Sequence, residues 1–168
     1  MAPPPPQQAN NTDRLDVALV GGGGLAEVEL AKLAQARAAS DGVKQFADRM
    51  AADHGRGNAR LAEAARAAGV PAPNEPTPDD KAMHERLAAL QGRSFDVAYL
   101  QGQLVAHQKT ATLLEWEIGQ GQHADLQRHA AESLPVVMQH LALVQALLGE
   151  VTGALPAAVA QKQARKTR

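Results

Sequence analysis

The chain has 168 residues, which is enough for one domain with a substantial core. Its 17 basic and 18 acidic residues nearly cancel, so we expect no nucleic-acid partner, because such proteins usually carry a basic excess. The absence of cysteine excludes disulfides and thiolate-bound metals. No apolar run approaches the roughly 18 residues of a membrane span, so none is predicted.

The apolar residues are mainly alanine and leucine, which favour helices, whereas aromatic residues make up only 2%. We therefore predict an all-α fold. In chain order, residues 1–11 are rich in proline, glutamine and asparagine and are predicted to form a disordered leader. A four-helix bundle domain is expected over residues 12–152, followed by a flexible basic tail over residues 153–168.

Capping residues, glycines and prolines divide this domain into four long helices. The first should be capped by Thr12 or Asp13 and run to about residue 39, and the others are expected at about 41–68, 94–120 and 124–151. A proline-rich segment and a short extra helix at about 79–90 connect the second long helix to the third. The two short connections predict antiparallel hairpins. The long middle connection fits either an up-down bundle or a ferritin-like crossover, and it favours the crossover.

Four consecutive glycines, at positions 21–24, lie inside the first predicted helix. Each one destabilises a helix by roughly 1 kcal/mol relative to alanine, so they need a reason. We interpret them as a kink or as a place where a neighbouring element approaches closely. A phosphate-binding loop would need a preceding strand and a following Gly-Lys-Ser/Thr, and neither is present.

Helical periodicity places one ionisable residue on the apolar stripe of each long helix. In chain order these residues are Glu29, His54, His107 and His140. A buried imidazole or carboxylate is costly unless it is hydrogen-bonded or bound to a metal. Counted from the short connections, the two members of each hairpin match in height to within about one helical turn of 5.4 Å.

Three imidazoles and one carboxylate at one height suit zinc, copper, nickel or iron. We therefore predict Glu29, His54, His107 and His140 as the ligands of a divalent transition metal. The alternative is a buried network of imidazole, carboxylate and Tyr99 that contains no metal and only specifies the bundle.

Five segments resemble one family of bacterial exported proteins, namely GGLAEVELAKLA (23–34), VKQFADRMAADH (43–54), SFDVAYL (94–100), VAHQKT (105–110) and LPVVMQHL (134–141). The family is known only as domain of unknown function 4142 and is grouped with ferritin-like bundles. The resemblance covers about residues 13–150. It implies a periplasmic or otherwise exported protein, since members usually carry a signal peptide, which this sequence does not include.

The recurrent polar positions of that family correspond here to Glu27, Glu29, Asp53, His54, Tyr99, His107 and His140. The resemblance thus adds Glu27, Asp53 and Tyr99 as residues flanking the predicted ligands. Di-iron ferritin-like proteins carry Glu-x-x-His on two helices. Ala51 and Val137 stand three residues before His54 and His140, so neither motif is present and di-iron chemistry is not expected.

The family has no agreed biochemical activity, so the resemblance implies a fold and a compartment. We expect an exported helical bundle without catalytic activity that has a structural, stress-related or interaction role. The alternative is a metal-binding bundle for transport, sensing or storage, and a metal-dependent enzyme comes third. A metal ion and a second copy of the chain are the partners that the sequence leaves open.

Overall fold

The computed structural model describes residues 7–153, which form five α-helices and no β-strand. The helices are α1 (Asn11–Arg37), α2 (Asp41–Ala67), α3 (Pro78–Ala88), α4 (Gly92–Gln120) and α5 (Ala124–Thr152). The predicted all-α class is therefore confirmed. Residues 1–6 of the predicted leader and 154–168 of the predicted tail lie outside the described residues.

The start of α1 differs slightly from the prediction, because its N-cap is Asn10 instead of Thr12 or Asp13. The Asn10 side chain accepts a hydrogen bond from the Asp13 N–H at 2.9 Å, and the Asp13 carboxylate accepts one from the Asn10 N–H at 2.6 Å. Such a reciprocal capping box satisfies two N–H groups that the first turn leaves unpaired. Residues 10 and 11 of the predicted leader therefore belong to the helical domain.

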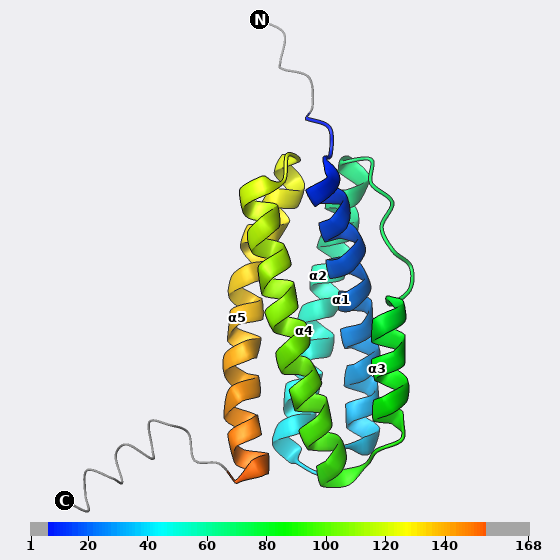
Figure 1. The fold of residues 1–168 in the computed structure, drawn as a ribbon, viewed down its shortest axis with the longest axis vertical. Coiled ribbons are helices and arrows are strands. Elements are labelled where there is room, and N and C mark those ends of the chain that lie inside the picture. Colours follow the sequence, from blue (N-terminus) through cyan, green and yellow to red (C-terminus); the bar gives the residue numbers. More distant parts are fainter. Residues whose placement is uncertain (1–6, 154–168) are drawn as a thin grey trace, which may run out of the picture.

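The long helices pack as two antiparallel hairpins, α1 with α2 and α4 with α5. Between the hairpins, α1 lies against α4 and α2 lies against α5, while α3 packs on α1 and α4. The connection after α2 starts at one end of the molecule and returns along its length through α3 to the other end, where α4 begins (Figure 1). As a result α2 and α4 run in the same direction, which a simple up-down order would not give.

Gly21 and Gly22 allow this returning connection to lie against α1. A Cβ atom at Gly21 would stand 2.7 Å from the ring of Pro73, and one at Gly22 would stand 2.8 Å from the Thr77 methyl group. A Cβ atom at Gly24 would collide with the Asn58 side chain of α2. Of the two interpretations made from the sequence, close approach is therefore the one that this geometry supports.

The core has apolar layers at both ends and a polar layer at mid-height. One apolar cluster holds Phe46, Met50 and Tyr99, and the ring of Tyr99 stacks on Phe95 at 5.5 Å. The clusters toward the other end hold Val17, Leu61, Leu126, Leu114 and Val137. Between them in each long helix lie the polar residues Glu27, His54, Gln103, His107 and His140.

Buried aspartates fasten both ends of the bundle. Asp13 of α1 accepts hydrogen bonds from two backbone N–H groups of the α4–α5 connection, at 3.1 and 3.2 Å. Asp96 of α4 accepts hydrogen bonds from the N–H groups of Ala39 and Ser40, in the α1–α2 connection, at 3.1 and 2.9 Å. An aspartate of each hairpin therefore accepts hydrogen bonds from backbone N–H groups in the connection of the other hairpin. These bonds fix the relative position of the two hairpins.

Asp96→Ala is expected to lower the free energy of unfolding by about 1–3 kcal/mol, because it leaves two N–H groups without their acceptor. Urea denaturation measures the loss. Glu115→Ala, at an exposed position of the same helix, is the control and should change the stability by less than about 0.5 kcal/mol. Equal stability of the two variants would contradict the fastening role of Asp96.

Two further carboxyl groups are buried near Asp13. Asp16 is 2% exposed and Glu117 is 0% exposed, and in their ionised forms none of their four side-chain oxygens has a hydrogen-bond donor within residues 7–153. Burial, and secondly the charge of Asp13, raises the pKa of Asp16 to about 7. Burial, and secondly a hydrogen bond from protonated Glu117 to the Asp13 carboxylate, raises the pKa of Glu117 to about 8, and the charges of Asp16 and Asp13 add to the shift. This end of the bundle therefore retains protons that exposed acids lose.

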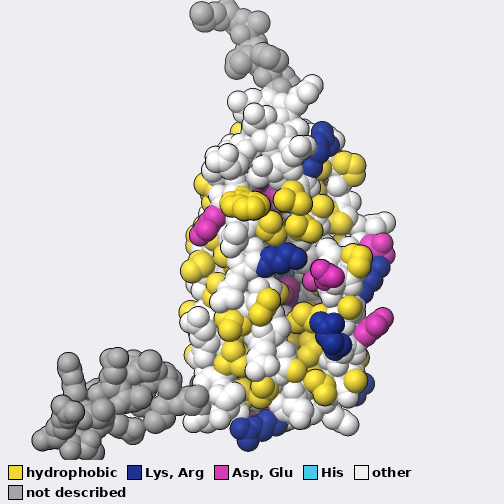
Figure 2. Space-filling view, in the orientation of Figure 1, with side chains coloured by type: hydrophobic (Ala, Val, Ile, Leu, Met, Phe, Trp, Pro, Cys, Tyr) yellow, Lys and Arg dark blue, Asp and Glu magenta, His cyan; other side chains and the backbone are white. Residues whose placement is uncertain are grey.

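The face of the molecule in Figure 2 carries Lys, Arg, Asp and Glu side chains scattered among hydrophobic ones, and no stripe of a single charge crosses it.

Helix α5 differs from the prediction that the chain has no segment able to span a membrane. Its length and composition would allow it to cross a bilayer, with a mean hydropathy of 1.4 over 18 residues, although polar residues such as Gln139 interrupt the run. In the bundle it packs against α4 and α2 and buries His129 and His140.

Candidate metal centre

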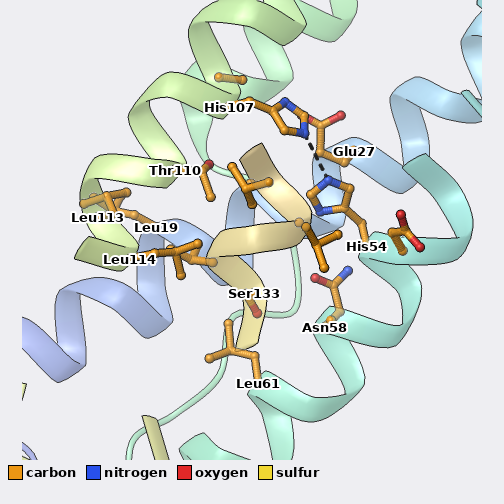
Figure 3. Close-up of a pocket in the computed structure, with 18 of the residues that line it drawn as sticks. Leu19, Glu27, His54, Asn58, Leu61, His107, Thr110, Leu113, Leu114 and Ser133 are labelled. Atoms are coloured by element: carbon orange, nitrogen blue, oxygen red, sulfur yellow. Dashed lines mark hydrogen bonds and ion pairs between the residues drawn. The ribbon is translucent and has the colours of Figure 1, made fainter. Parts of the chain in front are cut away.

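Three histidines from three helices meet in the polar layer of the core. His107 Nε2 lies 3.4 Å from His54 Nε2 and 3.2 Å from His140 Nδ1. The three ring centroids are 5.2 to 5.4 Å apart, so the imidazoles form a nearly equilateral cluster. Figure 3 shows the rings of His54 and His107 pointing toward one another from α2 and α4.

The structure brings together three of the four predicted ligands. His107 and His140 are each 1% exposed, and His54 is half-buried. Within residues 7–153, these three histidines are the one group of three or more His, Asp and Glu side chains that could hold a metal ion, and their ligand atoms all lie within 4.8 Å of one another. Their role as metal ligands stays a prediction at this point.

The predicted inward orientation of Glu29 is wrong, because Glu29 is exposed and Glu27 is the buried carboxylate of α1. Two residues correspond to a rotation of about 200° around a helix. The stripe used for the prediction included Leu15, which is 41% exposed. The buried face is instead built mainly from small and acidic residues at spacings of three and four, which are Asp13, Val17, Gly21, Gly24, Glu27, Ala31 and Ala34. This spacing of small and acidic residues could have identified the buried face from the sequence. A search for hydrophobic residues does not detect it.

The outer nitrogens of two imidazoles are held by hydrogen bonds. His107 Nδ1 lies 2.9 Å from the carbonyl oxygen of Gln103, which can only accept, so Nδ1 carries the proton. His140 Nε2 lies 2.8 Å from Asp53 Oδ2 and donates to that carboxylate. In neutral rings the inner nitrogens, His107 Nε2 and His140 Nδ1, are then both unprotonated.

Asp53 and Glu27 support this arrangement from outside the cluster. Asp53 is itself paired with Arg49, at 3.2 Å, and with Arg56. Gln103 Nε2 donates to Glu27 Oε2 at 2.7 Å, and the other oxygen of Glu27 lies 3.9 Å from His107 Nδ1. Both flanking carboxylates thus lie beside the histidines, on the sides that face away from the inner nitrogens.

The predicted flanking residue Tyr99 and a further buried histidine, His129, lie apart from the cluster. Tyr99 is fully buried but belongs to the apolar end of the core, and its hydroxyl has no hydrogen-bond partner within the described residues. His129 is also buried, and its Nε2 lies 3.3 Å from the carbonyl oxygen of Gly57 and 3.3 Å from Ser133 Oγ. The metal-free network with Tyr99 considered from the sequence is therefore not formed through the hydroxyl of that residue.

Burial keeps all three imidazoles uncharged at neutral pH. It lowers the pKa of His54 to about 3, helped by the nearby His107 and His140, and it lowers the pKa of His107 to about 4, helped by His140. The pKa of His140 is also lowered by burial, although Asp53 opposes the change. Burial raises the pKa of Glu27 to about 7, although the bond from Gln103 opposes it.

Two of the three separations between the inner nitrogens fit a tetrahedral metal. Zinc–imidazole distances of about 2.0–2.1 Å place two ligand nitrogens about 3.3 Å apart at a tetrahedral angle. The separations from His107 Nε2 are 3.2 Å to His140 and 3.4 Å to His54, and the ligand atoms of His54 and His140 lie within 4.8 Å of each other. Neutral imidazoles are good ligands for zinc, copper, nickel and iron, and the pairs His140–Asp53 and His107–Gln103 are the outer contacts that usually orient metal-binding histidines.

The fold and the cluster together define an all-α bundle protein with three histidines converging in its core. The chain belongs to the family described as Domain of unknown function (DUF4142), whose model matches residues 1–147. The resemblance noted in the sequence is thereby confirmed.

Among solved structures, the chain is similar to the crystal structure of a DUF305 fragment from Deinococcus radiodurans, with a TM-score of 0.75. The match covers 87% of this chain and 99% of that one at 14% identity, so it supports the helical fold alone. No curated protein matches the chain.

Proposed function

We propose that this protein binds one divalent transition-metal ion, such as zinc or copper, through His54, His107 and His140. The observation that carries the proposal is the contact between His107 Nε2 and His140 Nδ1. These atoms lie 3.2 Å apart, while the protons of both rings are directed outward to Gln103 and Asp53. Two lone pairs that face each other repel, and a cation between them removes the repulsion.

Hydrogen bonding within the cluster is a poorer explanation. His54 Nε2 can donate to His107 Nε2 across 3.4 Å, but the inner nitrogen of His140 still has no donor. A second proton would have to charge a buried ring, and burial disfavours that charge in all three histidines. A metal ion supplies the positive charge and satisfies three nitrogens at once.

A single site of this kind favours transport or sensing of a metal over bulk storage.

We also infer that the chain is a ferritin-like four-helix bundle with α3 in its crossover, because the connection between α2 and α4 runs the length of the molecule. The family resemblance supports export from the cytoplasm. Immunodetection in fractionated native cells tests the compartment, and a cytoplasmic signal would contradict it.

Isothermal titration of the untagged, metal-free protein with Zn²⁺ tests the proposal. We expect one ion per chain with a Kd of about 1 µM or tighter, which corresponds to roughly −8 kcal/mol. Replacing His54, His107 or His140 with alanine should weaken binding by at least about 100-fold. Asp53→Asn, which removes the negative charge that orients His140, should weaken it by about 10-fold.

His84→Ala is the matched control, because His84 lies on α3 outside the cluster. It should bind zinc like the original protein. The proposal fails if the metal-free protein takes up no zinc, or if the three cluster variants bind it as tightly as the control.

A further inference from the structure

Resting on this proposed function, we infer that the metal centre is open, and that a cavity beside it receives a small anion that coordinates the metal. The three histidines supply three ligands, and within residues 7–153 no fourth His, Asp or Glu brings a ligand atom within 4.8 Å of all three of theirs. Closed structural zinc sites have four protein ligands, whereas sites with three keep a position for an exogenous ligand.

Glu27 is the carboxylate that could close the site, but its position argues against that role. It lies on the Nδ1 side of His107, at 3.9 Å, which is the opposite edge of the ring from the inner Nε2. Its other oxygen accepts a hydrogen bond from Gln103 at 2.7 Å. Glu27 is therefore committed to another partner, and the fourth position is left to a molecule from outside.

A cavity of about 100 Å³ adjoins the cluster and is lined by all three histidines together with Glu27. Its walls continue away from the histidines over Leu19, Leu113, Leu114 and Val137, with Thr110 close to His107 along α4 (Figure 3). A cavity that holds benzene is about 150 Å³, so this one accommodates a molecule of a few heavy atoms. Polar and charged side chains, among them Asn58, Lys109 and Ser133, also line the cavity, so a molecule bound to the metal would have polar contacts as well as apolar ones.

Charge favours a monoanion over a neutral molecule. The three imidazoles are neutral ligands, so a divalent ion would keep its full charge in a largely buried site. Asp53 is neutralised by its pairs with Arg49 and Arg56. One small anion on the metal lowers the uncompensated charge, which reduces the cost of burying it.

Azide and Co²⁺ are the probes for this inference, because Co²⁺ replaces zinc and reports its coordination in visible absorption. Co²⁺ binding is measured first, and azide is then titrated into the loaded protein. We expect a saturable change in the cobalt bands. Thr110→Phe, which fills the cavity, should weaken azide binding by at least about 10-fold while Co²⁺ binding is retained. Thr112→Phe, at an exposed position of the same helix, should behave like the original protein.

Glu27→Gln separates an open site from a closed one. If the site is open, Glu27 acts only as an outer contact of the ligands, so this variant weakens Co²⁺ binding by about 10-fold, less than the loss of a histidine ligand, and still binds azide. If Glu27 is the fourth ligand, the variant loses Co²⁺ affinity and the original protein does not respond to azide, which overturns the inference while the metal site stands. Equal azide affinity in Thr110→Phe also overturns it. Absence of Co²⁺ binding would refute the proposed function and this inference together.

Discussion

Zinc is expected to raise the melting temperature of the metal-free protein by about 8–16 °C when its free concentration is about 1,000 times the Kd. Binding to the folded state alone adds about 4 kcal/mol at that concentration. A domain of this size gains roughly 2–4 °C for each kcal/mol. The histidines come from α2, α4 and α5, so the ion links both hairpins, and unfolding must release it. Calorimetry with and without zinc measures the shift, which EDTA should reverse.

His54→Leu is the decisive variant for this effect. Leucine is similar in size to the imidazole but cannot donate to His107 Nε2, so the metal-free variant should be less stable than the original protein by about 1–3 kcal/mol. It should also lose nearly the whole zinc-dependent rise. A rise of equal size in His54→Leu would show that zinc stabilises the fold from somewhere else.

Glu117→Met is expected to stabilise the protein at alkaline pH by about 1–3 kcal/mol, the cost of a buried charged group without partners. The pKa of Glu117 rises from 4.5 in the unfolded chain to about 8 in the folded protein. The folded state therefore holds its proton more tightly. The corresponding stability is fully present below pH 4.5 and is lost as the pH rises through about 8. Methionine has no such proton to lose.

Urea denaturation at pH 5, 7 and 9 checks this dependence. The difference between Glu117→Met and the original protein should grow with pH, whereas Glu115→Met, at an exposed position of α4, should run parallel to the original. Glu117→Gln separates charge from polarity, because it removes the titration but keeps a polar group in the core. Parallel curves for all the proteins would mean that Glu117 is ionised at little cost.

Composition and residue spacing were enough to predict the class of fold and three of the residues that meet in the core, His54, His107 and His140. Alanine and leucine at helical spacing, with caps and prolines between, defined helices whose ends lie within about three residues of those observed. Short connections fix the register of a hairpin, so counting residues from them placed His107 and His140 at one height. These histidines also lie on the apolar stripes of their helices, and an apolar stripe faces the core, so their side chains were predicted to point inward.

The rotation of each helix about its axis, and the groups that the histidines contact, depend on packing between helices and could not be predicted from the sequence. On α1 the buried face consists of small and acidic residues that pack against other helices, so hydrophobicity selected Glu29 where packing buried Glu27. The pairs His140–Asp53 and His107–Glu27 join residues 87 and 80 positions apart. The positions of the ring protons follow from such contacts between helices, and periodicity within one helix carries no information about its neighbour's rotation.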